Sequence, residues 1–224
     1  MNTRCIFFDL DGTLLDSVPS IVESMSYALE LKMGFAPDYE TLVSGIGTPL
    51  DEQLLTHSFA YLGRRLDPRE LDEFRGAYKD HNLANHDDVI ATFDGVGSAL
   101  DALRTLGCPM GIVTSKPNDI ARRGLRVCKI ESFFDFVIGY DDVANPKPHP
   151  EPVLTAINYM KASAETCLFV GDSPHDILSG NEANCPTGAA LWGPFQRDSL
   201  AAANPTYYFD HIHDIPAWAS QSNA

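Results

Sequence analysis

Hydrophobic and polar residues follow two different patterns along the chain, and the switches between them divide the sequence into segments. Residues 3–9 form a short apolar run that ends in acidic residues and a glycine, which predicts a buried strand leading into a turn. Between about residues 19 and 85 the apolar positions recur at helical intervals, as at Ile21, Met25 and Leu29, with almost no strand pattern. This segment is predicted to be a compact helical insert.

After about residue 92 the pattern alternates regularly between short apolar runs and amphipathic stretches. Strands are predicted at 108–115, 134–139, 166–172, 187–193 and 206–210. Helices are predicted at 96–107, from 118, at 151–162, from 174 and near 198. Such alternation predicts an α/β fold, with a Rossmann-like parallel sheet covered on both faces that the first strand joins across the insert.

One helix of the insert has a clear start. Asp67 is a suitable N-cap, Pro68 occupies the first helical position, and Glu70 completes a capping box. The sequence predicts this helix as the third of the insert, with Leu71, Phe74 and Tyr78 near one face.

Composition narrows the choice of partners. The 224 residues include 16 basic and 31 acidic side chains, for a formal net charge of −15. Such a charge repels nucleic acid and anionic membranes, so neither is expected as a partner. A small anionic substrate would also be repelled overall, so a site for one needs a local lysine or metal ion.

The cysteines and the amino-terminal residues indicate a reducing environment. The five cysteines are odd in number, lack paired spacing and lie in or beside apolar runs, as expected of reduced core residues. The start "MNTRCIFF" is too short for a signal peptide, and no apolar segment is long enough to cross a bilayer. We therefore expect a soluble, cytoplasmic protein.

Polar residues follow the predicted strands, and because parallel strands end at one edge of a sheet, we expect these side chains to converge. Lys147 follows a short acidic loop and is expected to supply the missing positive charge. The converging residues are Asp9, Asp11, Thr114, Ser115 and Asp172. Taken alone, Asp-x-Asp-Gly-Thr also fits a polar turn, and the acids at 172 and 176 also fit the first turn of a helix.

Four segments, taken together, carry a resemblance to a known family. The segments "DLDGTLLDS", "GIVTSKP", "NPKPHPEP" and "VGDSPHDI" resemble, in order, the motifs of the haloacid dehalogenase superfamily. The branch they resemble has a helical C1-type cap, and "TSKP" and "KPHPEP" are most similar to phosphoglycolate phosphatases. The resemblance implies a core of residues 1–15 and 87–224 and a cap of residues 16–86.

The resemblance also implies a role for each matching residue. Asp9 would attack phosphorus and become an aspartyl phosphate, while Asp11 would protonate the leaving oxygen and later activate water. Thr114 would bind a phosphoryl oxygen, and Lys147 would neutralise charge. The backbone around Gly12 and Ser115 would complete the phosphate cradle.

A magnesium ion is implied as well, held by the Asp9 carboxylate, the Asp11 carbonyl and the Asp172 carboxylate. Asp176 would order the metal shell or Lys147 rather than bind metal directly. Two further residues are left with two interpretations: Lys116 as a contact to a substrate carboxylate or as a structural residue, and His149 as a base or ligand or as a structural residue.

The cap loop "SGIGTPLDEQL" would face the substrate, with Gly45 and Gly47 giving flexibility, although both glycines also fit a simple turn. The loop has no basic residue, so Arg64, Arg65 or Lys116 would have to compensate for a polyanionic leaving group. We expect a magnesium-dependent phosphatase of a small phosphorylated metabolite, acting as a monomer or homodimer. A pyrophosphatase, a phosphosugar mutase and a non-catalytic binding protein remain alternatives, whereas a dehalogenase is disfavoured because those relatives lack an acid at the position of Asp11.

Overall fold

A six-stranded parallel sheet forms the centre of the computed structural model, which describes residues 4–221. The strands are β1 (Cys5–Phe8), β2 (Met110–Val113), β3 (Phe136–Ile138), β4 (Cys167–Gly171), β5 (Thr187–Ala190) and β6 (Tyr207–Phe209). Their order is β3-β2-β1-β4-β5-β6, and every neighbouring pair is parallel. The predicted α/β fold and all six predicted strands are confirmed.

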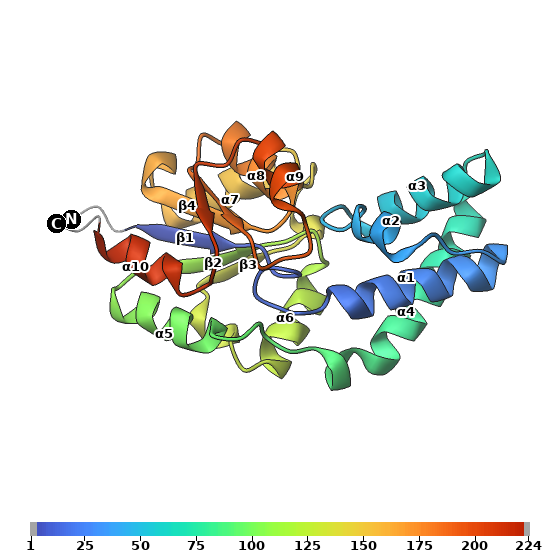
Figure 1. Cartoon of the computed structure of the whole chain (residues 1–224), viewed down its shortest axis with the longest axis horizontal. Coiled ribbons are helices and arrows are strands. Elements are labelled where there is room, and N and C mark those ends of the chain that lie inside the picture. Colours follow the sequence, from blue (N-terminus) through green and yellow to red (C-terminus); the bar gives the residue numbers. More distant parts are fainter. Residues whose placement is uncertain (1–3, 222–224) are drawn as a thin grey trace.

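Helices cover both faces of this sheet (Figure 1). One face carries α5 (Val96–Thr105), α6 (Asn118–Val127) and α10 (Asp214–Gln221), and the other carries α7 (Glu151–Met160), α8 (Pro174–Glu182) and α9 (Arg197–Ala202). Short 3-10 helices lie at Glu131–Phe133, Tyr140–Asp142 and Ala164–Thr166. Helix α10 has no counterpart among the elements predicted from the sequence.

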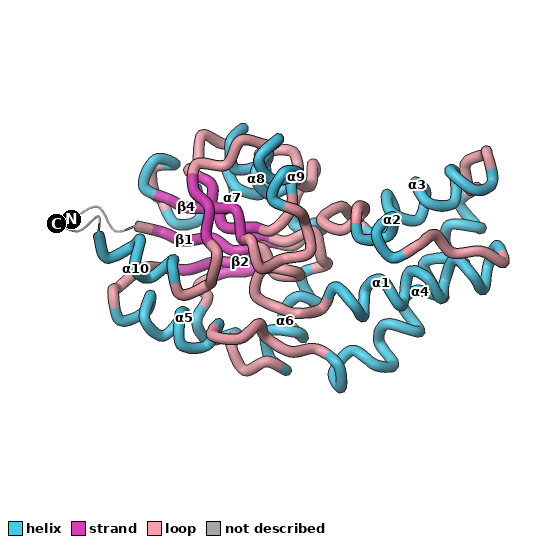
Figure 2. The backbone as a smooth tube through the Cα atoms, viewed as in Figure 1, coloured by secondary structure: helices cyan, strands magenta, loops and turns pink. Residues whose placement is uncertain are grey.

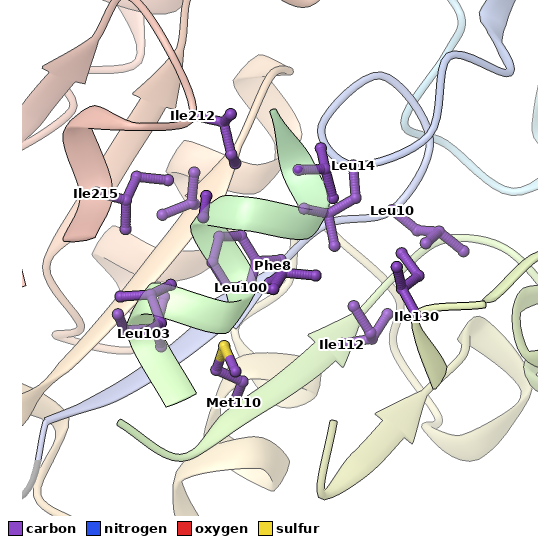
Figure 3. Close-up of a cluster of buried hydrophobic side chains, with 14 of the residues drawn as sticks. Phe8, Leu10, Leu14, Leu100, Leu103, Met110, Ile112, Ile130, Ile212 and Ile215 are labelled. Carbon is purple, nitrogen blue, oxygen red and sulfur yellow. The ribbon is translucent and has the colours of Figure 1, made fainter. Parts of the chain in front are cut away.

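Alternate residues of each strand point to opposite faces, so the sheet has two apolar layers. Phe8 and Ile112 contribute to the layer under α5 and α10, where they meet Leu100 and Ile215 (Figure 3). Phe7 faces the other layer, with α7. Because both faces are covered, β1 to β5 are buried along their whole length, which explains their continuous apolar runs.

The chain between β1 and α5 forms a separate group of helices (Figure 2). These are α1 (Val18–Met33), α2 (Tyr39–Val43), α3 (Leu50–Leu62) and α4 (Pro68–Val89), here called the helical insert. The insert has its own apolar core, which includes Met25, Leu29, Leu54 and Phe74. The division of the chain into domains at 16 and 86 stays a prediction, and α4 itself continues past 86 to Val89.

The predicted capping box is present at the start of α4. The Asp67 side chain accepts from the Glu70 amide at 2.9 Å, and the Glu70 carboxylate accepts from the Asp67 amide at 2.9 Å. This helix is the fourth of the insert and not the third, because the five-residue helix α2 precedes α3. A helix this short carries too few apolar positions to show a helical period in the sequence.

Two antiparallel chain segments join the insert to the sheet. The Asp16 amide donates to the Ala91 carbonyl at 2.9 Å, and the Phe93 amide donates to the Leu14 carbonyl at 3.1 Å. Leu15 and Thr92 form an isolated antiparallel bridge between these bonds. The insert therefore leaves and re-enters the core at one place, beside the carboxyl end of β1.

Candidate functional site

The site lies at the carboxyl ends of the three central strands, where the strand order changes direction. Phe8 pairs with Ile112 of β2 and with Val170 of β4, so the residues that follow β1, β2 and β4 are neighbours. In the sheet, β2 lies on one side of β1 and β4 lies on its other side. The sheet therefore grows from β1 in both directions. Ligands in open parallel sheets bind at such a point, because the connections diverge and leave a crevice.

Asp9 and Lys147 form a buried ion pair at this edge. The Lys147 ammonium donates to Asp9 Oδ1 at 2.8 Å and to Asp176 Oδ1 at 2.5 Å, and 2% or less of its residue surface is exposed. Burial alone would lower the pKa of Lys147, but the carboxylates of Asp176 and Asp9 outweigh it and hold that pKa above its ordinary value. The positive charge that the acidic sequence required is therefore at the site.

Burial dominates the titration of the nearby acids. It raises the pKa of Asp9 to about 7, with the neighbouring Asp176 carboxylate adding to the effect and Lys147 opposing it. Burial and the charges of Asp9 and Asp176 also raise the pKa of Asp172 well above its usual range. The negative charge in this cluster is therefore only partly compensated by protein groups.

The arrangement of the three carboxylates fits a divalent cation. One oxygen each of Asp9, Asp172 and Asp176 lies within 4.8 Å of the others, and all three residues are buried. Asp172 Oδ1 accepts from the Thr13 hydroxyl at 2.6 Å, but Oδ2 is buried without a hydrogen-bond partner among the described residues. Three carboxylates and one ammonium leave two negative charges, which a divalent ion would balance, and oxygen ligands suit such an ion.

Gly12 leaves room for this cluster. Its φ is +85°, and a Cβ at this position would lie 2.4 Å from Asp172 Oδ2. Its amide donates to the Leu15 carbonyl at 2.9 Å, so the predicted contact of Gly12 with phosphate stays a prediction. The structure gives the glycine another reason, because no larger residue allows Asp172 to approach the turn.

Asp11 lies outside the carboxylate cluster and faces a cleft. Its Oδ1 accepts from the Ser17 hydroxyl at 2.5 Å and from the Lys116 ammonium at 2.6 Å. Lys116 is thus paired with Asp11, which favours its structural interpretation over a contact with a substrate carboxylate. The structure brings the two aspartates of the motif to the same turn but gives them different surroundings, one buried and one open to the cleft.

The remaining predicted residues lie around this turn. Thr114 is buried and its hydroxyl accepts from the Lys116 amide at 3.2 Å. The Ser115 hydroxyl donates to the Gly47 carbonyl at 2.5 Å, so this side chain contacts the insert. Asp176 pairs with Lys147, and the ordering role predicted for it stays a prediction. His149 Nδ1 accepts from the Glu151 amide at 3.1 Å at the start of α7, which is a structural contact.

A cleft of about 510 Å³ lies between the site and the insert. Asp9, Asp11, Thr114 and Ser115 line it on the core side, and residues of α1, α3 and α4 line it on the other. Arg64 and Arg65 do not line the cleft: Arg64 pairs with Glu70 at 2.6 Å near the start of α4. The basic residues of the insert that reach the cleft are instead Arg75 and Lys79.

Several supporting contacts were missed by the sequence analysis. Thr13 and Ser17 lie inside the first motif and hold Asp172 and Asp11, and the Trp192 indole donates to the Thr13 carbonyl at 2.9 Å. The Ser173 hydroxyl donates to Asp176 Oδ2 at 2.6 Å. Proximity to the motifs would have flagged the first two residues, but nothing in the sequence indicates that Trp192 reaches the turn after β1.

All five cysteines are free thiols, and four of them are buried. None of the described helices is both long and apolar enough to cross a membrane.

Comparison with known proteins places the chain in a family. The profile of the haloacid dehalogenase-like hydrolases matches residues 6–190. Pyrophosphatase PpaX from Anoxybacillus flavithermus is 34% identical over 215 residues, which is 96% of both chains. PpaX from Listeria monocytogenes is also 34% identical, over 95% of this chain and 94% of its own.

Solved structures with a similar fold also include proteins described as phosphatases. A protein from Haemophilus somnus, described as a predicted phosphoglycolate phosphatase, superposes with a TM-score of 0.87 at 25% identity, covering 97% of this chain and 98% of its own. Because the profile spans most of the chain and the curated relatives match nearly end to end, the protein belongs to the haloacid dehalogenase-like hydrolase family.

Proposed function

We propose that this protein is a magnesium-dependent phosphatase that hydrolyses phosphomonoesters through a covalent intermediate on Asp9. The observation that supports the proposal is that the two aspartates of the turn after β1 have different surroundings. Asp9 lies buried against Lys147 and the carboxylate cluster, whereas Asp11 faces the cleft beside Lys116 and Ser17. A nucleophile and a separate proton carrier two residues apart are what a two-step displacement needs.

In the first step, an Asp9 carboxylate oxygen attacks phosphorus and the bond to the leaving oxygen breaks, while Asp11 gives that oxygen a proton. In the second step, Asp11 takes a proton from water, which attacks the aspartyl phosphate and releases inorganic phosphate. Asp9 and Asp11 both return to their starting states, so the cycle balances without an external acid or base.

Lys147 and Thr114 would stabilise the charge that develops on the transferring group. Lys147 already contacts Asp9, and Thr114 lines the same cleft as Asp9. Magnesium, held by Asp9 and Asp172 together with the Asp11 carbonyl, would supply further positive charge for the phosphoryl oxygens. Asp176 would keep Lys147 in place through its 2.5 Å contact.

The names of the relatives suggest a second candidate function. The curated relatives are called pyrophosphatases, and a structural neighbour is described as a phosphoglycolate phosphatase. Both substrates carry a second anionic group beyond the phosphoryl group that is transferred. Pyrophosphate hydrolysis would use the same first step, with inorganic phosphate as the leaving group, so the residues around Asp9 do not discriminate between the two activities.

The proposal is tested by trapping the intermediate. Protein mixed with a ³²P-labelled phosphomonoester and magnesium, then quenched in acid, should carry label on the peptide that contains Asp9. Asp9→Asn should abolish both the label and turnover. Asp80→Asn is the matched control, because Asp80 is an exposed aspartate on α4 that does not line the cleft. Turnover that persists in Asp9→Asn would contradict the mechanism.

A further inference from the structure

The insert touches the core directly above the site, so both walls of the cleft are defined. The Ser115 hydroxyl donates to the Gly47 carbonyl at 2.5 Å. A Cβ at Gly47 would lie 2.9 Å from Ser173 Oγ, so the loop before α3 rests against the start of α8. A substrate whose phosphoryl group lies at Asp9 must therefore place its leaving group in the cleft that this contact closes.

Several polar side chains of the insert that line the cleft are already engaged within the protein. Arg75 donates from Nε and Nη2 to the two carboxylate oxygens of Asp51, each at 2.8 Å. The Gln53 amide donates to the Thr48 carbonyl at 2.8 Å. Moving these groups toward a ligand would break bonds that the protein makes in its own structure.

Positive charge for a second anionic group is scarce in the cleft. Lys116 is paired with Asp11, and Arg75 with Asp51. Lys79 is exposed, and within residues 4–221 it is the one basic side chain of the lining without an ion-pair partner. Acidic residues outnumber basic ones in the lining. They are Asp9, Asp11, Asp51, Asp119 and Asp141.

Apolar side chains fill the rest of the lining, from both walls. Leu83 of α4 and Tyr140 of the 3-10 helix Tyr140–Asp142 are 38% and 39% exposed. Other apolar lining residues are Ile21, Ile46, Pro49, Leu50, Tyr78, Pro117 and Ile120. Exposed apolar surface that converges on a cleft next to reactive groups is typical of a binding site for an apolar group.

The volume of the cleft agrees with an organic leaving group. At about 510 Å³ it lies within the range of roughly 300–1,000 Å³ that small-molecule sites occupy. A pyrophosphate ion is far smaller and has no apolar surface. It would leave most of the apolar lining in contact with water, so the lining would contribute nothing to its binding.

Resting on the proposed function, we infer that the substrate is a phosphomonoester whose leaving alcohol is apolar, either alkyl or aryl, and carries no second anionic group. The bond that breaks joins phosphorus to the alcohol oxygen, which takes its proton from Asp11 and leaves as a neutral alcohol among apolar side chains. Pyrophosphate and phosphoglycolate are poorer substrates because their second anionic group meets an excess of carboxylates.

The test is a series of alkyl phosphates compared with the two anionic substrates. Ethyl, butyl and hexyl phosphate have leaving groups of nearly equal basicity, so differences in kcat/KM report binding of the alkyl chain in the transition state. Burial of each added methylene should raise kcat/KM by about fourfold until the cleft is filled. Pyrophosphate and phosphoglycolate should both fall below butyl phosphate.

A pair of variants on α4 assigns the effect to the cleft. Leu83→Asn places a polar group in the lining and should lower the ratio of kcat/KM for hexyl to ethyl phosphate by about threefold or more. Val89→Asn is the matched control, because Val89 is an exposed apolar residue of the same helix, 51% exposed, that does not line the cleft. It should keep the wild-type ratio.

The outcomes separate this inference from the proposed function. Equal kcat/KM across the alkyl series, or a preference for pyrophosphate or phosphoglycolate, overturns the inference while an Asp9-dependent phosphatase stands. A chain-length effect that Leu83→Asn and Val89→Asn alter equally also overturns it. Absence of Asp9-dependent hydrolysis for every ester overturns both the proposed function and the inference built on it.

Discussion

The core and the insert hold the charged groups nearest the cleft in different surroundings. On the core side, Asp9 lines the cleft, and Lys147 pairs with Asp9 and with Asp176; these three side chains are 6% exposed or less. On the insert side, the pair between Arg75 and Asp51 is 29% and 46% exposed, and the remaining lining is largely apolar. Of these two sets of charges, the one beside the position where phosphorus would react is the more desolvated, and desolvation strengthens electrostatic interactions.

This difference between the core wall and the insert wall reflects what each wall must do. The core wall must hold several charges in fixed positions, so each buried group depends on its neighbours. The insert wall needs only shape and apolar surface, so its residues depend less on one another. Changes on the core wall should therefore cost more stability and activity than changes on the insert wall.

The largest effect is expected for Lys147→Met. Removing the ammonium leaves the Asp9 and Asp176 carboxylates buried without their partner, which should lower the free energy of unfolding by roughly 3–5 kcal/mol. The loss of charge stabilisation should also lower kcat roughly 10²–10³-fold. Urea unfolding in the presence of a chelator gives the first value and steady-state kinetics the second. A stability loss under about 1 kcal/mol would contradict the described buried pair.

The next effect concerns pH in the absence of divalent cations. Burial raises the pKa of Asp9 from 3.8 to about 7, so between these values the folded protein binds more protons than the unfolded chain. The free energy of unfolding should therefore fall as pH rises from about 4 to about 7, by on the order of a few kcal/mol. Urea unfolding at several pH values in a chelator measures this slope.

Two further measurements test whether the buried carboxylates cause this pH dependence. Magnesium, by stabilising the ionised carboxylates, should reduce the slope, and Asp9→Asn should reduce it without any cation. Hydrogen bonds lower the pKa values of Glu70 and Asp87 to about 2. These two groups therefore change the free energy of unfolding mainly below the range of pH 4 to 7. A slope that neither magnesium nor Asp9→Asn changes would show that the buried carboxylates do not control it.

A smaller effect is expected where the two walls meet. Gly47→Ala forces a residue with a φ of +95° into strain and places a Cβ against Ser173, so kcat/KM should fall roughly tenfold as the loop is displaced. Gly63→Ala is the control: its φ is +67°, but a Cβ there has no atom within 4 Å among the described residues. Both variants should lose roughly 1–2 kcal/mol of stability by urea unfolding. Equal activity losses would contradict the proposed role of the loop contact.

The smallest effect is expected on the insert wall. Arg75→Met removes partly exposed ion pairs with Asp51 and Asp72, and the free energy of unfolding of the protein should change by no more than about 1 kcal/mol. The same urea measurement applied to Lys147→Met provides the contrast. If the two methionine variants lost equal stability, the distinction between the walls would disappear.

Much of the fold and of the core wall could be predicted from the sequence. The strands were found because those buried on both faces are continuous apolar runs, and the helices because their apolar positions repeat with helical spacing. Asp9, Asp11, Thr114 and Asp172 were expected at one edge because polar residues that end parallel strands share it. Lys147 was expected there because it follows a short acidic loop after such a strand. The helix α10 and the short helix α2 were missed, since short elements carry few periodic positions.

The sequence alone determined which residues gather at the carboxyl edge of the sheet, because strand ends and motif order are local properties of the chain. Only the tertiary structure decided that Lys116 is paired with Asp11 and that Arg75 and Lys79, rather than Arg64 and Arg65, reach the cleft. It also decided which apolar side chains of the insert line the cleft. These facts depend on how the insert lies against the core. That placement is set by contacts between residues far apart in the chain, such as Ser115 with Gly47, which no local pattern records.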